Sequence, residues 1–235
     1  MHRARDCNLH TEFECEINAW HFSLFKGRLR GIFCRDNITA AILSNPLYIL
    51  PPQYQQELVV TEPYIPETTQ WLTRAVIGLN FCPFAKAVHV KGQIRYVVSE
   101  ATHIDALVED LIDELEKLAA ANPSEIDTTL LIHPHVMQDF LEYNDFLEVA
   151  DAVVDEMKLT GIIQIASFHP DYQFAETDPD DITNFTNRAP YPTLHLLREE
   201  SVEKAVAAFP EAADIFEKNI ETLKKLGHEG WKKLL

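Results

Sequence analysis

Long apolar runs are absent from the sequence, which argues against membrane-spanning helices. The longest candidate, "NITAAILSNPLYILPP" (residues 37–52), is interrupted by Asn45 and Pro46. The N-terminal segment "MHRARDCNLHTEFECE" is not followed by the apolar core that a signal peptide needs. We therefore expect a cytoplasmic protein with no membrane partner.

Cysteine is also scarce, with four residues in the chain. Cys7, Cys15 and Cys34 lie in the first 60 residues, and Cys82 stands alone after them. So few and scattered cysteines argue against a disulfide framework. No C-x-x-C pair occurs, so the sequence gives no indication of a structural zinc knuckle or a dithiol redox pair.

Basic residues are outnumbered: 20 Lys and Arg face 37 Asp and Glu, for a formal net charge of -17. Residues 1–60 contain six residues of each sign, so the whole excess lies in the remaining 175 residues. A surface this acidic repels phosphate backbones, and no basic stripe offsets it. We expect no nucleic-acid partner.

The change of composition near residue 60 divides the chain into two unlike parts. Residues 1–60 have no sustained helical or strand period, and "LPPQYQQ" at their end is typical of a linker. Two interpretations stay open for this segment: an accessory extension, or a start codon assigned too far upstream. Residues 61–235 are expected to form a single α/β domain.

From residue 61 onward the hydrophobic periodicity predicts a regular series of helices and strands. Helices are predicted at residues 61–80, 102–122 (capped by Thr102), 136–161 and 201–227 (interrupted at Pro210). Strands are predicted at residues 93–100, 127–134, 162–170 and 193–199, with a long polar loop before the last.

This order, α-β-α-β-α-β-loop-β-α, predicts an α/β fold with a four-stranded, mainly parallel sheet and helices packed against it. Strands joined by helical crossovers are parallel. The continuous apolar segments "TLLI" and "IIQIA" are typical of strands that are covered on both faces.

Two of the predicted strands end in the same way, "LLIHP" with His133 and "ASFHP" with His169. Ligands of open α/β sheets gather beyond the carboxyl ends of the strands. We expect both imidazoles on neighbouring parallel strands near one cleft, as acid/base groups, with Asp171 close by. Two alternatives remain: each histidine only caps its strand, or His133, His135 and His169 bind zinc or iron. No HExxH segment supports the metal.

The loop at residues 170–192 is long for a compact domain, and such loops are often functional. Its Arg188 is a cation in an acidic chain and is expected to bind a carboxylate or phosphate, next to Asn187. The alternative is a salt bridge to one of the many nearby acids.

Cys82 lies in the distinctive segment "GLNFCPFAKAVHVKG". Pro83 is favoured in a first helical turn, so Cys82 at the cap of a short helix, with Lys86 one turn on, would have a lowered pKa and act as a nucleophile. Packed between Phe81 and Phe84, the thiol would instead be structural, and desolvation would raise its pKa. The buried, structural alternative is the one we favour.

A thioredoxin-like redox protein is another alternative for this cysteine. "CPFA" is similar to the "CPxC" of glutaredoxins without the second cysteine, and Pro192 precedes a strand as the active-site proline of those proteins does. In that fold, however, the cysteine follows a strand and begins a helix, whereas Cys82 is predicted between a helix and a strand.

Residues from about 66 to 231 resemble a bacterial family catalogued only as a domain of unknown function, number fourteen-fifteen. The matching stretches are "VIGLNFCPFAKAVHVKGQIRYVVS", "TTLLIHP", "FLEYNDFLEVAD", "IQIASFHPDYQFA" and "DDITNFTNRAPYPTLHLLRE". The resemblance implies a domain that begins near residue 60, and it carries no activity or cofactor.

The leading functional hypothesis is a small enzyme acting on a polar or anionic metabolite. His133 and His169 would be the acid/base groups and Cys82 a candidate nucleophile, with Arg188, Asn187, Lys86 and Asp171 binding the substrate. The alternative from another class is a non-catalytic ligand-binding or interaction domain in which the same residues shape a pocket. A small-molecule ligand suits both hypotheses, and the sequence indicates no particular cofactor or oligomeric state.

The division near residue 60 leads to a first prediction. A chain that begins at Thr61 is expected to fold on its own, because the regular pattern of helices and strands starts there. Thermal unfolding followed by circular dichroism measures this directly. Loss of a cooperative transition in the shortened chain, when the full chain shows one, would reject the division.

Overall fold

The computed structural model describes residues 62–208 and 214–234. The predicted N-terminal segment at residues 1–60 and the predicted interruption at Pro210 lie outside this range. Within it, no helix is long and apolar enough to cross a membrane.

The described residues form an α/β fold in which the elements follow closely the predicted order. The helices are α2 (Tyr64–Trp71), the π-helical η2 (Leu72–Ile77), α3 (Ala85–Val90), α4 (Ile104–Ala120), α5 (Phe140–Glu156), the 3₁₀ helix η3 (Ile182–Thr186), α6 (Glu199–Ala208) and α7 (Ile215–Lys232). The strands are β1 (Ile94–Val98), β2 (Thr128–Ile132), β3 (Ile163–Phe168) and β4 (Thr193–Arg198).

The four strands form one mixed sheet in the order β1-β2-β4-β3. Only β1 and β2 pair in parallel, while β4 pairs antiparallel with both β2 and β3. The prediction of a mainly parallel sheet was therefore wrong. The physical reason is the connection between β3 and β4, which contains only the short η3 and no crossover helix, so the chain returns between β2 and β3 in the opposite direction.

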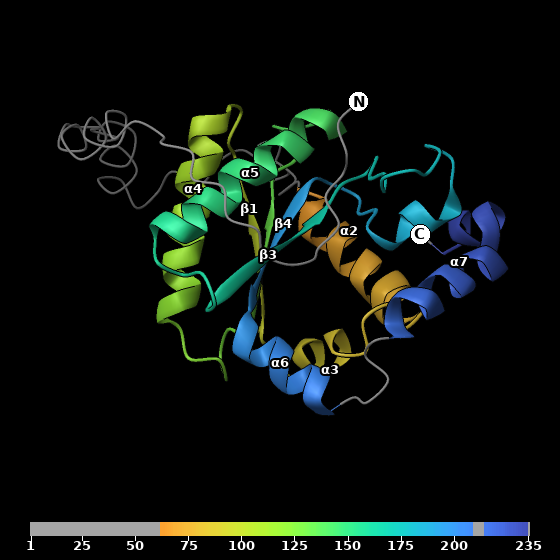
Figure 1. The fold of residues 1–235 in the computed structure, drawn as a ribbon, viewed down its shortest axis with the longest axis horizontal. Helices are drawn as coiled ribbons and strands as arrows, with labels where there is room; N and C mark the ends of the chain where they lie inside the picture. Colours follow the sequence, from red (N-terminus) through yellow and green to blue (C-terminus); the bar gives the residue numbers. More distant parts are fainter. Residues whose placement is uncertain (1–61, 209–213, 235) are drawn as a thin grey trace, which may run out of the picture. The chain divides into compact units, whose positions relative to one another are not determined.

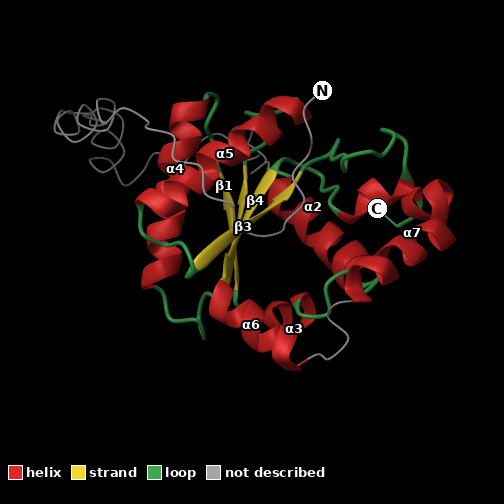
Figure 2. Ribbon diagram, viewed as in Figure 1, coloured by secondary structure: helices red, strands yellow, loops and turns green. Residues whose placement is uncertain are grey.

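Helices cover both faces of the sheet. Helices α4 and α5 lie on one face, and α2, α3 and α6 lie towards the other (Figure 1; Figure 2). Leu107, Leu111 and Leu115 of α4 are fully buried against the first face. All five residues of β2 are buried, as its continuous apolar sequence predicted.

Local contacts explain where the helices begin and end. The cap of α4 is His103, whose Nδ1 accepts from the N–H of Ala106, so the predicted cap by Thr102 was wrong. Helix α5 begins at the Asp139 cap, which accepts from two backbone N–H groups. The helix that begins at Ile215 is interrupted at Gly227, where it was predicted to stop, because that residue has a non-helical φ of 63°; after this kink α7 continues to Lys232.

Candidate functional site

His133 and His169 reach the same edge of the sheet, because β2 and β3 run in the same direction. The prediction that they lie on neighbouring strands was wrong, because β4 lies between β2 and β3. The ring of Tyr143, from α5, lies 5.6 Å from that of His133 and 5.2 Å from that of His169. All three side chains are fully buried, and the Tyr143 hydroxyl donates to the carbonyl of Thr193 at 2.9 Å.

The turn between β2 and α5 supplies the hydrogen bonds of both histidines. His169 donates from Nε2 to the carbonyl of Met137 at 3.1 Å and accepts at Nδ1 from the N–H of Asp171 at 3.0 Å. His133 donates from Nδ1 to the carbonyl of Val136 at 3.2 Å, and its buried Nε2 has no partner among the described residues. Both rings are thereby held in one neutral form.

Burial sets the titration of these two rings. It lowers the pKa of His133 to about 4 and also lowers the pKa of His169. His135, the third residue of the hypothetical metal site, is exposed and packs against Tyr64. No group of three or more His, Cys, Asp or Glu side chains suited to a metal ion occurs within residues 62–208 and 214–234.

Arg188 is engaged inside its own loop. It donates to the carbonyls of Tyr172 at 3.1 Å and Pro179 at 2.7 Å, and its guanidinium lies 4.4 Å from the centre of the Phe185 ring. Asn187 donates to the carbonyl of Ser167 and accepts from the N–H of His169. Asp171 is exposed; its backbone N–H donates to the His169 ring, and its charge acts on both His169 and Arg188. The loop polar groups therefore stabilise the loop and the strand end.

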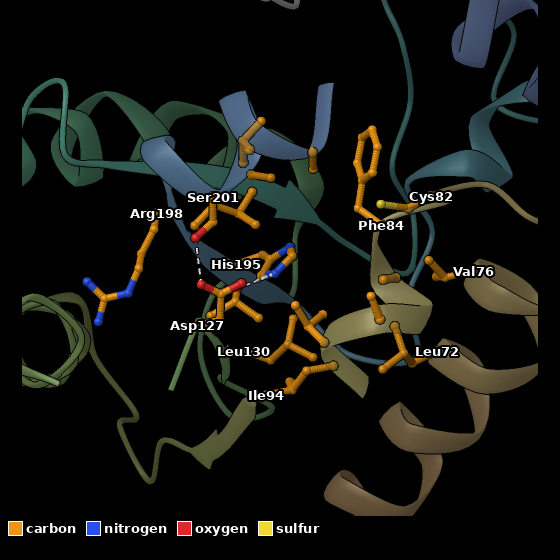
Figure 3. Close-up of a pocket in the computed structure, with 18 of the residues that line it drawn as sticks. Leu72, Val76, Cys82, Phe84, Ile94, Asp127, Leu130, His195, Arg198 and Ser201 are labelled. Atoms are coloured by element: carbon orange, nitrogen blue, oxygen red, sulfur yellow. Dashed lines mark hydrogen bonds between the residues drawn. The ribbon is translucent and has the colours of Figure 1, made fainter. Parts of the chain in front are cut away.

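A pocket of about 670 Å³ lies on the opposite face of the sheet (Figure 3). Leu130, His195 and Ala166 form a row across its floor, because His195 of β4 pairs with Leu130 of β2 and with Ala166 of β3. The walls come from α2, η2, the segment leading into α3, α3 itself and α6. Their apolar side chains include Trp71, Leu72, Val76, Phe84, Val88, Val202 and Ala205.

Cys82 lines this pocket, whereas Lys86 is exposed on α3 and does not. Figure 3 shows the Cys82 sulfur beside Phe84, on the wall of the pocket. Burial raises the pKa of the Cys82 thiol, although hydrogen bonds from the backbone of Phe84 and Ala85 act in the opposite direction. The direction agrees with the buried alternative for this cysteine.

His195 is the polar group on the floor of the pocket. The Thr128 hydroxyl donates to the carbonyl of Leu196 at 2.7 Å, so the same oxygen accepts from His195 Nε2, also at 2.7 Å. Burial lowers the pKa of His195 to about 4. The ring is therefore neutral at pH 7, with its proton on Nε2 and a lone pair on Nδ1.

The remaining polar groups lie towards the end of the pocket formed by α6. Ser201 donates to Asp127 Oδ1 at 2.6 Å (Figure 3). Arg198 donates to the carbonyls of Leu118, Ala121 and Ile126, and so joins β4 to the end of α4.

The family described as "Protein of unknown function (DUF1415)" matches residues 63–233. The chain belongs to this family. No curated protein and no solved structure matches the chain. The family assignment confirms the resemblance found in the sequence and gives no activity for the DUF1415 domain.

Sequence reasoning singled out one side chain of the DUF1415 pocket, Cys82, and missed His195. The histidine stands in the alternating strand "TLHLLRE", where a single polar residue among apolar ones gives little signal. Its role depends on which face of the sheet it occupies, and that follows from the pairing of β4 with β2 and β3. The predicted site residues thus divide between the strand-end cluster, the loop and the pocket, except Lys86, which is exposed on α3.

The environment of Cys82 predicts slow alkylation at neutral pH. In a full-length variant with serine at positions 7, 15 and 34, the reaction of Cys82 with iodoacetamide should show an apparent pKa above the free value of about 8.5, because burial disfavours the thiolate. The same protein in urea is the control and should react as a free thiol. Rapid labelling of the folded protein at pH 7 would contradict the buried interpretation.

The buried histidines predict that acid destabilises the domain. An unfolded histidine binds its proton near pH 6.5 and folded His133 only near pH 4, so the unfolded state holds more protons between these values. The free energy of unfolding should fall as pH decreases from 6.5 to 5, by up to about 1.4 kcal/mol per pH unit for each such histidine. Urea unfolding across this pH range measures the slope.

The His133→Asn variant tests the origin of that slope. Its side-chain amide can still donate to the carbonyl of Val136, but it does not titrate. The variant is expected to be less stable at pH 7 and to show a shallower dependence on pH. An unchanged slope would show that His133 does not carry the effect.

Proposed function

We propose that the DUF1415 domain binds a small, largely apolar molecule in the pocket between the sheet and α2, η2, α3 and α6. The observation that carries this proposal is an apolar pocket of about 670 Å³ whose floor carries His195 Nδ1, an acceptor without a hydrogen-bond partner among the described residues. Ligand pockets have volumes of about 300–1,000 Å³ and are mainly apolar, with a few polar groups that orient the ligand.

Contact of the apolar pocket surface with water is unfavourable. The side chains of Leu72, Val76, Leu130 and Phe84 line the pocket, and Leu72 and Val76 also belong to the core cluster beside it. Transfer of apolar surface out of water is favourable by about 25 cal/mol per Å². A ligand that covers these side chains gains that free energy without a rearrangement of the sheet.

An enzyme that uses His133 and His169 on a polar or anionic metabolite has less support. Both rings are fully buried, neither lines the pocket, and Arg188 already donates to two carbonyls of its own loop. A thioredoxin-like reaction at Cys82 has less support as well, because burial raises the pKa of the thiol that would have to ionise. The binding function needs neither group to react.

Pocket-filling substitutions test the proposal. Nile red, a neutral apolar dye, should bind the full-length protein with enhanced fluorescence. The Ala205→Phe variant should weaken binding by about tenfold or more, because the added ring occupies the pocket and removes contact area. Fluorescence titration measures both dissociation constants.

Val206→Phe is the matched control, since Val206 is the next residue of α6, is 45% exposed and does not line the pocket. It should bind the dye within about twofold of the wild type, as expected for a surface change. Thermal unfolding should show that both variants fold. A dye that fails to bind the wild type, or binds both variants equally, would reject the pocket as the binding site.

A further inference from the structure

We infer that the pocket selects neutral ligands that carry a hydroxyl or N–H donor on an apolar body, and that His195 Nδ1 accepts that hydrogen bond. This inference rests on the proposed binding function and specifies the chemical class of the ligand. It excludes the carboxylate and phosphate ligands that the sequence hypothesis favoured.

Thr128 determines which nitrogen of the His195 ring carries the proton. A carbonyl oxygen only accepts, so the 2.7 Å bond between Thr128 Oγ1 and the carbonyl of Leu196 uses the hydroxyl proton of Thr128. The Thr128 oxygen can then only accept from His195 Nε2, which is also 2.7 Å away. The backbone of β4 thereby fixes, through Thr128, which ring nitrogen carries the proton.

The other ring nitrogen of His195, Nδ1, is free to accept a hydrogen bond from a ligand. His195 Nδ1 has a lone pair and no hydrogen-bond partner among the described residues. Figure 3 shows the His195 ring on the floor of the pocket, between Asp127 and the wall formed by Phe84. A ligand that donates to this nitrogen gains a hydrogen bond in an apolar pocket that a ligand without a donor does not gain.

The arrangement of charged groups around the pocket disfavours an anionic ligand. The other titratable side chains that line the pocket are Asp127, Arg198 and Cys82. Asp127 accepts from Ser201, and the charged guanidinium of Arg198 donates to backbone carbonyls at the end of α4 and points away from the pocket (Figure 3). The exposed amide of Gln164 is the remaining polar group. His195 itself is neutral at pH 7 because burial lowers its pKa to about 4. An anionic head group at His195 would therefore lose water without a direct cation contact.

Three ligands of matched size test the inference: 4-octylphenol, 4-octylanisole and 4-octylbenzoate. Each should be titrated against Nile red bound to the full-length protein at pH 7. The phenol is expected to bind about 3- to 10-fold tighter than the anisole, because only the phenol can donate to His195. The benzoate should bind more weakly than both, because its charge loses water without gaining a cation.

Two variants assign the selectivity to the histidine. His195→Phe keeps a ring of similar size without either nitrogen, so the anisole should still bind and the advantage of the phenol should disappear. Thr128→Val removes the acceptor that holds the proton on Nε2, so the imidazole can present N–H to the pocket and the advantage should shrink. Thermal unfolding checks that both variants fold.

The outcomes separate this inference from the proposed function. If Nile red binds and the phenol and anisole displace it equally, or the benzoate displaces it best, the pocket stands and the selectivity is overturned. An advantage of the phenol that survives in His195→Phe also overturns it. If neither dye nor ligand binds the wild type, the binding function itself fails.

Discussion

The pairing of β4 with both β2 and β3 is the interaction on which the rest of this structure depends. It joins two strands that α5 connects but that do not touch each other. At the start of β4, the carbonyl of Thr193 accepts from Tyr143, and that of Pro192 accepts from the N–H of His133. At its end, Arg198 donates to carbonyls at the end of α4. One strand thus fixes the helices on one face and the pocket on the other.

The two faces of the sheet have different physical roles. The face under α4 and α5 is closely packed, and His133 and His169 are neutral and buried there with Tyr143. The opposite face is covered only in part by helices, and a large apolar pocket remains. His195 differs from these two fully buried histidines because its free nitrogen faces that pocket. Burial keeps His133 and His169 neutral inside the core on one side of the sheet, and it keeps His195 neutral at the pocket on the other.

Much of the fold could be predicted from the sequence, but the site could not. Hydrophobic periodicity indicated the helix of Leu107 and Leu111, and the continuous apolar run indicated the buried β2. The direction of β4 was missed because the parallel rule was applied to a connection without a crossover helix. That error also hid the site, since the role of His195 depends on Thr128, a residue 67 positions away in the sequence. His133 and His169 were predicted as site residues because both follow strand ends, but their ring nitrogens bond to backbone carbonyls of Val136 and Met137.

The central claim is that Thr128 fixes the neutral form of His195 so that Nδ1 is left free for a ligand. Nitrogen-15 NMR of the histidine side chains tests it most directly, with the His195 signals assigned by their loss in His195→Phe. The account predicts a protonated Nε2 and an unprotonated Nδ1 from pH 8 down to about pH 5, and a shift of the Nδ1 signal when 4-octylphenol binds. A proton on Nδ1, a ring that is charged at pH 6, or an Nδ1 signal unchanged by saturating 4-octylphenol would contradict it.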